Sequence, residues 1–257
     1  GMDEIPDYLG KAFVAIEDER FYQHNGIDFK SIIRAGYQFF KTGGEEAQGA
    51  STITQQLLKN TVFTDWTSEG NNKIKKIKRK IQEQYLALEI TKYYSKDEIL
   101  LRYMNAINLG QNTLGVESAS LRYFGKHCSE LTISECAVIA SITQNPSKYN
   151  PIRHPEENVK RREKCLNKML ELGFISQTQY DEAMADTDAV YERIGLYDID
   201  YQEANATTGS YFSDAVYEQV KQDLILSGYN ENMAETLLTS GGLRVESTLD
   251  PKIQAIL

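Results

Sequence analysis

Apolar residues recur at helical spacing along most of the chain, up to about residue 186. The first such stretch, residues 7–20, predicts a helix. A second predicted helix starts after Asp28, which has the chemistry of an N-cap, and ends at Gly43-Gly44. The side chains expected to point inward from these two helices are Tyr8, Phe13, Ile16, Phe21, Phe29, Ile32, Ile33 and Phe40.

The longest predicted helix covers residues 73–92 and has two unlike faces. One face begins with Lys and Arg residues between positions 73 and 80. The other is an apolar stripe, expected to pack inward, of Ile74, Ile77, Ile81, Tyr85 and Leu88. A shorter helix is predicted over residues 52–60 with Ser51 as its N-cap. Residues 61–72, which include Trp66, predict a surface loop near a membrane interface.

The rest of the chain is punctuated by capping boxes and prolines. Ser95 with Glu98 and Thr132 with Glu135 open two helices, and two more are predicted over residues 156–172 and 176–186. The composition changes after about residue 187, and the alternation within residues 243–249 favours a short strand. The fold class is therefore mainly α, with a domain over residues 1–187 and a short α/β segment over residues 188–257.

Composition excludes several classes of function. The chain has 257 residues and is 41% hydrophobic, which allows one large domain or one domain plus part of another. Its net charge of -9 argues against nucleic-acid binding. No apolar run reaches the length that spans a bilayer. Three cysteines are too few for a disulfide framework, and three scattered histidines predict no metal site.

The most distinctive stretch is residues 13–26, where Glu17 and Asp18 end an apolar run and Phe21, His24 and Gly26 follow. Apolar burial and a neighbouring like charge raise the pKa of a carboxylate, which suits it to acid–base catalysis near neutral pH. Glu17 is therefore a candidate base. Taken alone, the stretch is as well explained by a solvated helix end, and His24 is better explained as a structural hydrogen-bonding residue than as a base.

Two further polar stripes have the spacing of a shared site. Arg79, Lys80 and Glu83 fall on one helix face. Ser51, Gln55 and Lys59 recur every four residues. Each has a simpler explanation: the basic face of residues 73–80 could attract anionic lipid, Glu83 could be an intrahelical ion-pair partner, and Gln55-Gln56 could be a helix surface.

Five stretches, in order, resemble the peptidoglycan glycosyltransferase module, or family 51 transglycosylase domain, of the bifunctional class A penicillin-binding proteins. The matching residues are Glu17, Asp18, Phe21, His24 and Gly26; Gly49, Ser51, Thr52, Gln55, Gln56, Lys59 and Asn60; Arg79, Lys80, Glu83, Ala87 and Glu89; Lys96, Ile99, Leu100, Tyr103, Asn105 and Gly110; and Leu131, Glu135, Ala137, Pro146, Tyr149, Asn150 and Pro151. Asn108 and Cys136 depart from the family pattern. Residues 241–251 are similar to the linker that enters the transpeptidase domain of those proteins.

The resemblance implies a lysozyme-like α fold with a small membrane-facing lobe. It implies polymerisation of lipid II by inverting transfer, with release of undecaprenyl pyrophosphate. Glu17 would be the general base and Glu83 the second catalytic carboxylate. The implied substrate-binding residues are Asp18, which tunes Glu17 or orients its neighbours; Ser51, Gln55 and Gln56, which shape the site; and Lys59, Arg79 and Lys80, which hold the pyrophosphate.

The implied partners are lipid II, the growing glycan strand, membrane lipid and moenomycin-type inhibitors, with no nucleic acid. The implied location is the extracytoplasmic face of the cell membrane. No cofactor is required, and the sequence leaves open whether Mg²⁺ or Mn²⁺ assists at the phosphates. Two alternatives stay open: a lysozyme-like enzyme that cleaves glycans, and a non-catalytic scaffold that binds anionic lipid through residues 73–80.

Overall fold

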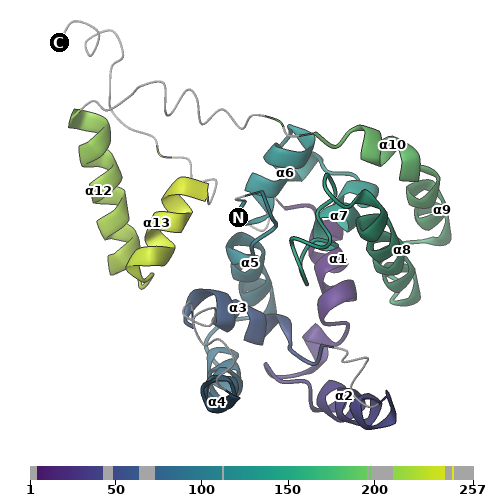
Figure 1. Cartoon of the computed structure of the whole chain (residues 1–257), viewed down its shortest axis with the longest axis horizontal. Helices are drawn as coiled ribbons and strands as arrows, with labels where there is room; N and C mark the ends of the chain where they lie inside the picture. The colour runs from purple at the N-terminus through teal and green to yellow at the C-terminus, as the bar shows by residue number, and fades with distance from the viewer. Residues whose placement is uncertain are drawn as a thin grey trace, which may run out of the picture.

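The computed structural model describes residues 5–42, 49–63, 73–111, 113–195, 197, 211–240 and 245. The helices over these ranges are α1 (Asp7–Glu17), α2 (Phe29–Thr42), α3 (Ile53–Thr61), α4 (Lys73–Ile90), α5 (Lys96–Ala106), α6 (Val116–Phe124), α7 (Ile133–Ala140), α8 (Pro155–Glu171), α9 (Gln177–Ala185), α10 (Thr187–Glu192), α12 (Tyr211–Leu226) and α13 (Glu231–Ser240) (Figure 1). Within them, extended pairing is limited to an isolated bridge between Asn108 and Leu114. The predicted mainly α class is confirmed.

Some sequence-based predictions fall on residues outside these ranges. The strand over residues 243–249 is one, apart from Val245, which has no regular structure. The Gly43-Gly44 helix stop and most of the 61–72 loop, with Trp66, are the others. The α/β character of the C-terminal segment therefore stays a prediction.

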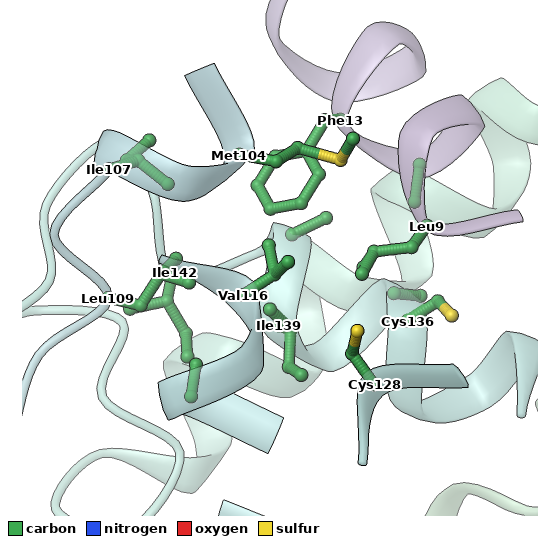
Figure 2. Packing of buried hydrophobic residues seen from close by; sticks show 14 of the residues in the cluster. Leu9, Phe13, Met104, Ile107, Leu109, Val116, Cys128, Cys136, Ile139 and Ile142 are labelled. Carbon is green, nitrogen blue, oxygen red and sulfur yellow. The ribbon is translucent and has the colours of Figure 1, made fainter. Parts of the chain in front are cut away.

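The main core surrounds α7, which is buried from Ser134 to Ala140. α1 and α8 pack against α7 and against each other, and α9 and α10 cover the same group. Figure 2 shows side chains converging here from α1 (Phe13), α5 (Met104) and α7 (Ile139). The three cysteines are free and buried, as expected for small apolar residues. The boundary at residue 187 stays a prediction, although α10 begins there and packs on α7 and α9.

A smaller cluster of Ile27, Leu58 and Ala87 lies apart from the main core. It joins α3 and α4 to the turn that follows α1. Gly26 is the residue that permits this contact, because its φ is +88° and a Cβ placed on it would lie 2.1 Å from the carbonyl oxygen of Ala87. The backbone of the turn thus rests directly on α4.

The predicted inward face is wrong for α4 and for most of α2, where Ile32 is partly buried against the small cluster of Ile27, Leu58 and Ala87. α2 has no buried residue, and Phe29, Ile33 and Phe40 are 65%, 73% and 87% exposed. On α4 the apolar stripe is also exposed, at Ile74, Ile77, Ile81, Tyr85 and Leu88, whereas Glu83 and Ala87 are buried. Periodicity locates a stripe but not the surface that covers it. On α4, small Ala87 admits the Gly26 turn, so the polar face is the one that packs.

The start of α3 also differs from the prediction. Its N-cap is Thr52, whose hydroxyl accepts a hydrogen bond from Gln55 N, while Gln55 Oε1 accepts from Thr52 N. Ser51 lies one residue before the cap. Its hydroxyl accepts a hydrogen bond from Lys80 Nζ, at 2.9 Å, and so connects α3 to α4.

We predict that Gly26→Ala lowers the free energy of unfolding by more than about 1 kcal/mol, because the new Cβ meets both the unfavourable φ and the Ala87 carbonyl. Gly36→Ala is the matched control: Gly36 lies within α2 and has open space around it, so alanine should be neutral or stabilising there. Chemical denaturation measures both. Equal stability of the two variants would contradict the packing described at Gly26.

Candidate active site

A cleft of about 1080 Å³ lies between α1, α3, α4 and α8 and the segments around residues 107–111 and 143–153. All of the sequence-predicted site residues line it except Arg79, which contacts Glu83 at its edge. The ionisable residues of the lining are Glu17, Asp18, Glu19 and Glu83, with Arg34, Lys59, Lys80, Arg153, Arg161, Lys164 and Lys168. The cleft therefore carries excess positive charge in a chain whose net charge is -9.

Glu17 is the last residue of α1, and its side chain is 9% exposed. Its Oε1 accepts hydrogen bonds from Thr143 Oγ1, at 2.5 Å, and from Arg161 Nη2, at 2.6 Å. Its Oε2 accepts from Gln56 Nε2 at 2.9 Å. Asp18 is the next residue along the chain, and the aromatic Tyr103 is linked to Glu17 through Gln56. Donors from three different segments hold the carboxylate in one orientation.

Thr143 and Arg161 were not predicted as site residues. Arg161 is fixed on three sides: Nη2 contacts Glu17, Nη1 donates to Gln144 Oε1 at 2.8 Å, and the guanidinium lies 5.0 Å from the centre of the Tyr149 ring. In the sequence Arg161 is one of many charges on a predicted surface helix. Its neighbour Arg162 is fully buried and serves structure instead. No local pattern distinguishes the two roles.

Asp18 points away from Glu17 and joins two segments. His24 Nε2 lies 2.9 and 3.0 Å from its two carboxylate oxygens, and Ile53 N donates to Oδ2 at 3.0 Å. Ile53 is the first residue of α3, where the helix dipole favours a negative charge. Asp18 therefore fixes the start of the helix that carries Gln55 and Gln56, and the structural role predicted for His24 is confirmed.

The two glutamines have different surroundings. Gln56 accepts from Tyr103 Oη at 3.2 Å, which turns its amide nitrogen toward Glu17. Burial raises the pKa of Tyr103 well above its usual value, so this phenol stays a donor. Gln55 uses its oxygen in the α3 capping box. Its Nε2 is buried at the cleft without a hydrogen-bond partner.

Cations gather at the α3–α4 end of the cleft around fully buried Glu83. Arg79 Nη1 donates to Glu83 Oε1, and Lys80 Nζ lies 2.9 Å from Oε2. The shared helix face is confirmed, and so is the ion-pair role of Glu83. Burial, followed by the charge of Arg79, lowers the pKa of Lys59, while Glu83 opposes that shift. Three cations against one carboxylate make this end suited to an anion.

No group of three or more His, Cys, Asp and Glu in the part of the chain that the structure describes is placed to hold a metal ion. None of the helices it contains is both long enough and apolar enough to cross a bilayer.

Comparison with known proteins identifies the class. Residues 1–170 match the family described as Transglycosylase, so the chain belongs to the transglycosylase family. It carries the transglycosylase domain of a protein similar to penicillin-binding protein 1A.

Two relatives illustrate the match. Penicillin-binding protein 1A of Clostridium perfringens (strain 13 / Type A) is 40% identical over 261 residues, which cover 98% of this chain and 37% of the relative. Penicillin-binding protein 1F of Bacillus subtilis (strain 168) is 38% identical over 253 residues, covering 98% and 32%. The chain thus spans about a third of the length of these relatives.

A similar solved structure is penicillin-binding protein 1A from Haemophilus influenzae, with a TM-score of 0.40 and 22% identity. The match covers 91% of this chain and 21% of that one.

We predict that inorganic pyrophosphate binding takes up protons at alkaline pH. The pKa of Lys59 is lowered in the empty cleft, and a bound anion raises it, so binding should weaken as pH rises through the lowered pKa. Isothermal titration calorimetry in buffers of different ionisation enthalpy measures the uptake. Lys59→Gln should abolish it, and Lys73→Gln, at an exposed position, should leave it unchanged. Uptake that persists in Lys59→Gln would remove Lys59 from the anion site.

Proposed function

We propose that this domain is a peptidoglycan glycosyltransferase that polymerises lipid II into glycan strands. The observation that carries the proposal is one fixed carboxylate, Glu17, in a cleft whose neighbouring wall concentrates cations around Lys59 and Lys80. A sugar hydroxyl needs a base in order to attack, and a pyrophosphate needs fixed cations in order to leave. The cleft offers both kinds of group.

Glu17 takes the proton from the acceptor's 4-hydroxyl as that oxygen attacks the anomeric carbon of the donor. The new glycosidic bond forms as the bond from the anomeric carbon to the phosphate oxygen breaks. The configuration inverts, because the attack comes from the face opposite the leaving group. Thr143, Arg161 and Gln56 hold the carboxylate in position for this step.

Undecaprenyl pyrophosphate leaves toward the α3–α4 end of the cleft. Lys59, Arg79 and Lys80 bind its oxygens, and the unpartnered Gln55 amide is a further donor. Glu83 keeps Arg79 and Lys80 in position, and it acts near the donor phosphate as the second carboxylate. Ser51 braces Lys80. Asp18 acts as a positioning residue through α3 rather than through the substrate.

The fold proposed is lysozyme-like, with α2 and α4 forming the small membrane-facing lobe. Both helices expose long apolar stripes, from Phe29 to Phe40 on α2 and from Ile74 to Tyr85 on α4. Lipid is the occupant that fits them, since the substrate's own tail lies in the bilayer. We place the domain at the extracytoplasmic face of the cell membrane, where the growing strand is its second partner.

Moenomycin-type inhibitors are expected to compete for the same anion-binding residues. The proposal assigns no resident cofactor. Turnover with and without chelator would decide whether Mg²⁺ or Mn²⁺ accompanies the pyrophosphate.

The two alternatives explain less of the cleft. A glycan-cleaving enzyme would also use a Glu, as an acid to a neutral leaving group, and would have no use for the cations around Glu83. A lipid-binding scaffold would need the exposed face of α4, but not the donors that fix Glu17. Polymer formed from purified lipid II, scored on a gel, separates both alternatives from the transferase.

We predict that Glu17→Gln reduces polymerisation by at least about 100-fold, because the amide keeps the shape but cannot accept the proton. Lipid II binding should be largely retained. Glu163→Gln, on α8 and outside the cleft lining, is the control and should polymerise normally. The measurement is the initial rate of polymer formation, with circular dichroism to verify folding. Near-normal turnover in Glu17→Gln would exclude Glu17 as the base.

We predict that Arg79→Gln and Lys80→Gln each abolish most turnover in detergent, whereas Lys73→Gln has little effect there. Position decides the difference: Arg79 and Lys80 contact Glu83, while Lys73 is exposed nearly two turns earlier, about 9–10 Å along the helix. Arg79→Lys should also be impaired, because an ammonium does not replace a planar fork. Small and equal losses of turnover in all four variants would contradict a specific role in pyrophosphate binding. They would instead favour a basic helix face that attracts lipid.

A further inference from the structure

Two cations of the cleft have no counter-ion. Arg153 and Lys164 are exposed and line the cleft, and neither charged end makes a hydrogen bond or ion pair with the described residues. The other cations on this side are paired. Arg161 is bound to Glu17, and both Arg34 and Lys168 are bound to Glu19. The two unpaired charges are therefore available to a ligand.

Arg153 lies apart from the cation cluster at Glu83. Arg153 follows Asn150, whose Oδ1 accepts from Arg153 N at 2.9 Å. Asn150 and Tyr123 of α6 both border Gly110: a Cβ placed there would lie 3.4 Å from Asn150 Nδ2 and 3.1 Å from Tyr123 Oη. Arg153 thus lies toward α6, which Figure 1 places at the opposite end of the domain from α2 and α4.

Lys164 lies on α8, in a row with two other cations that line the cleft. It lies one turn after Arg161 and one turn before Lys168, so the three residues share a helix face that spans about 10 Å. Lys168 is the residue of this row nearest α2. It forms an ion pair with Glu19, which also pairs with Arg34 of α2. The row therefore runs from the α2 side of the cleft, past Glu17, to Arg153 on the α6 side.

We infer that Arg153 and Lys164 bind carboxylates of the peptide that lipid II carries on its sugar, and so select acceptors by their peptide charge. The inference rests on the proposed function. The substrate has two kinds of anion. Its pyrophosphate is attached to the lipid and stays beside the α3–α4 cations, whereas its peptide branches from the sugar and can extend along α8, past Lys164, toward Arg153 on the α6 side. The planar guanidinium of Arg153 can donate two parallel hydrogen bonds to a carboxylate. The ammonium of Lys164, on a flexible side chain, is a second donor.

The test compares the Arg153→Gln/Lys164→Gln double variant with wild type on two substrates: lipid II with free peptide carboxylates and lipid II with those carboxylates amidated. We expect the variant's KM to rise about threefold to tenfold on the free-carboxylate substrate, with kcat nearly unchanged. On the amidated substrate the two proteins should not differ. A KM increase of the same size on both substrates would assign the two residues to phosphate and overturn the inference.

Lys160→Gln is the matched control. Lys160 is on α8 with the same charge, but it is paired with Glu157 and lies outside the cleft lining, so its KM should not change. A second measurement is independent of turnover: fluorescence anisotropy with a labelled, soluble disaccharide-peptide that has neither lipid nor phosphate. Weaker binding by the double variant supports the inference even if wild type makes no polymer, a result that would overturn the proposed function alone. Equal affinity overturns the inference.

Discussion

The site depends on the contacts of a single carboxylate, Asp18. It follows α1, holds the imidazole of His24 and accepts the first N–H of α3. Glu17 is the preceding residue, and Gln56, on the helix that Asp18 fixes, donates to it. The buried carboxylate of Asp18 therefore sets the distance between Glu17 and the helix that carries Gln56. Such a charge is stable only when its oxygens are satisfied, and His24 and Ile53 satisfy them here.

The second constraint is the direction in which α4 packs. Its charged face, with Glu83, turns inward because Ala87 and Gly26 allow two backbones to touch there. The apolar stripe is left on the surface. This arrangement costs buried apolar area, and it places Arg79 and Lys80 beside a cleft instead of in open water. α4 therefore lines the cleft with Lys80 and Glu83 and leaves its apolar stripe exposed.

The sequence predicted the helical class, and eight of the nine residues that it assigned to the site line the cleft, because capping boxes, helical periodicity and the five matching stretches are local signals. The packing faces of α2 and α4 could not be predicted, since periodicity locates an apolar stripe but not the surface that covers it. The surroundings of Glu17 could not be predicted either. Thr143 and Arg161 are 126 and 144 residues away in sequence, and only the packing of α8 on α1 brings them close.

The hydrogen bonds of Glu17 also make its contacts depend on the width of the cleft. Its Oε1 is held by Thr143 and Arg161, which belong to the α7–α8 side, and its Oε2 by Gln56 of α3. Widening the cleft would break the Gln56 bond first and leave the other two in place. The freed oxygen would then face the cleft. A change in the width of the cleft would thus act on Glu17 through a single hydrogen bond.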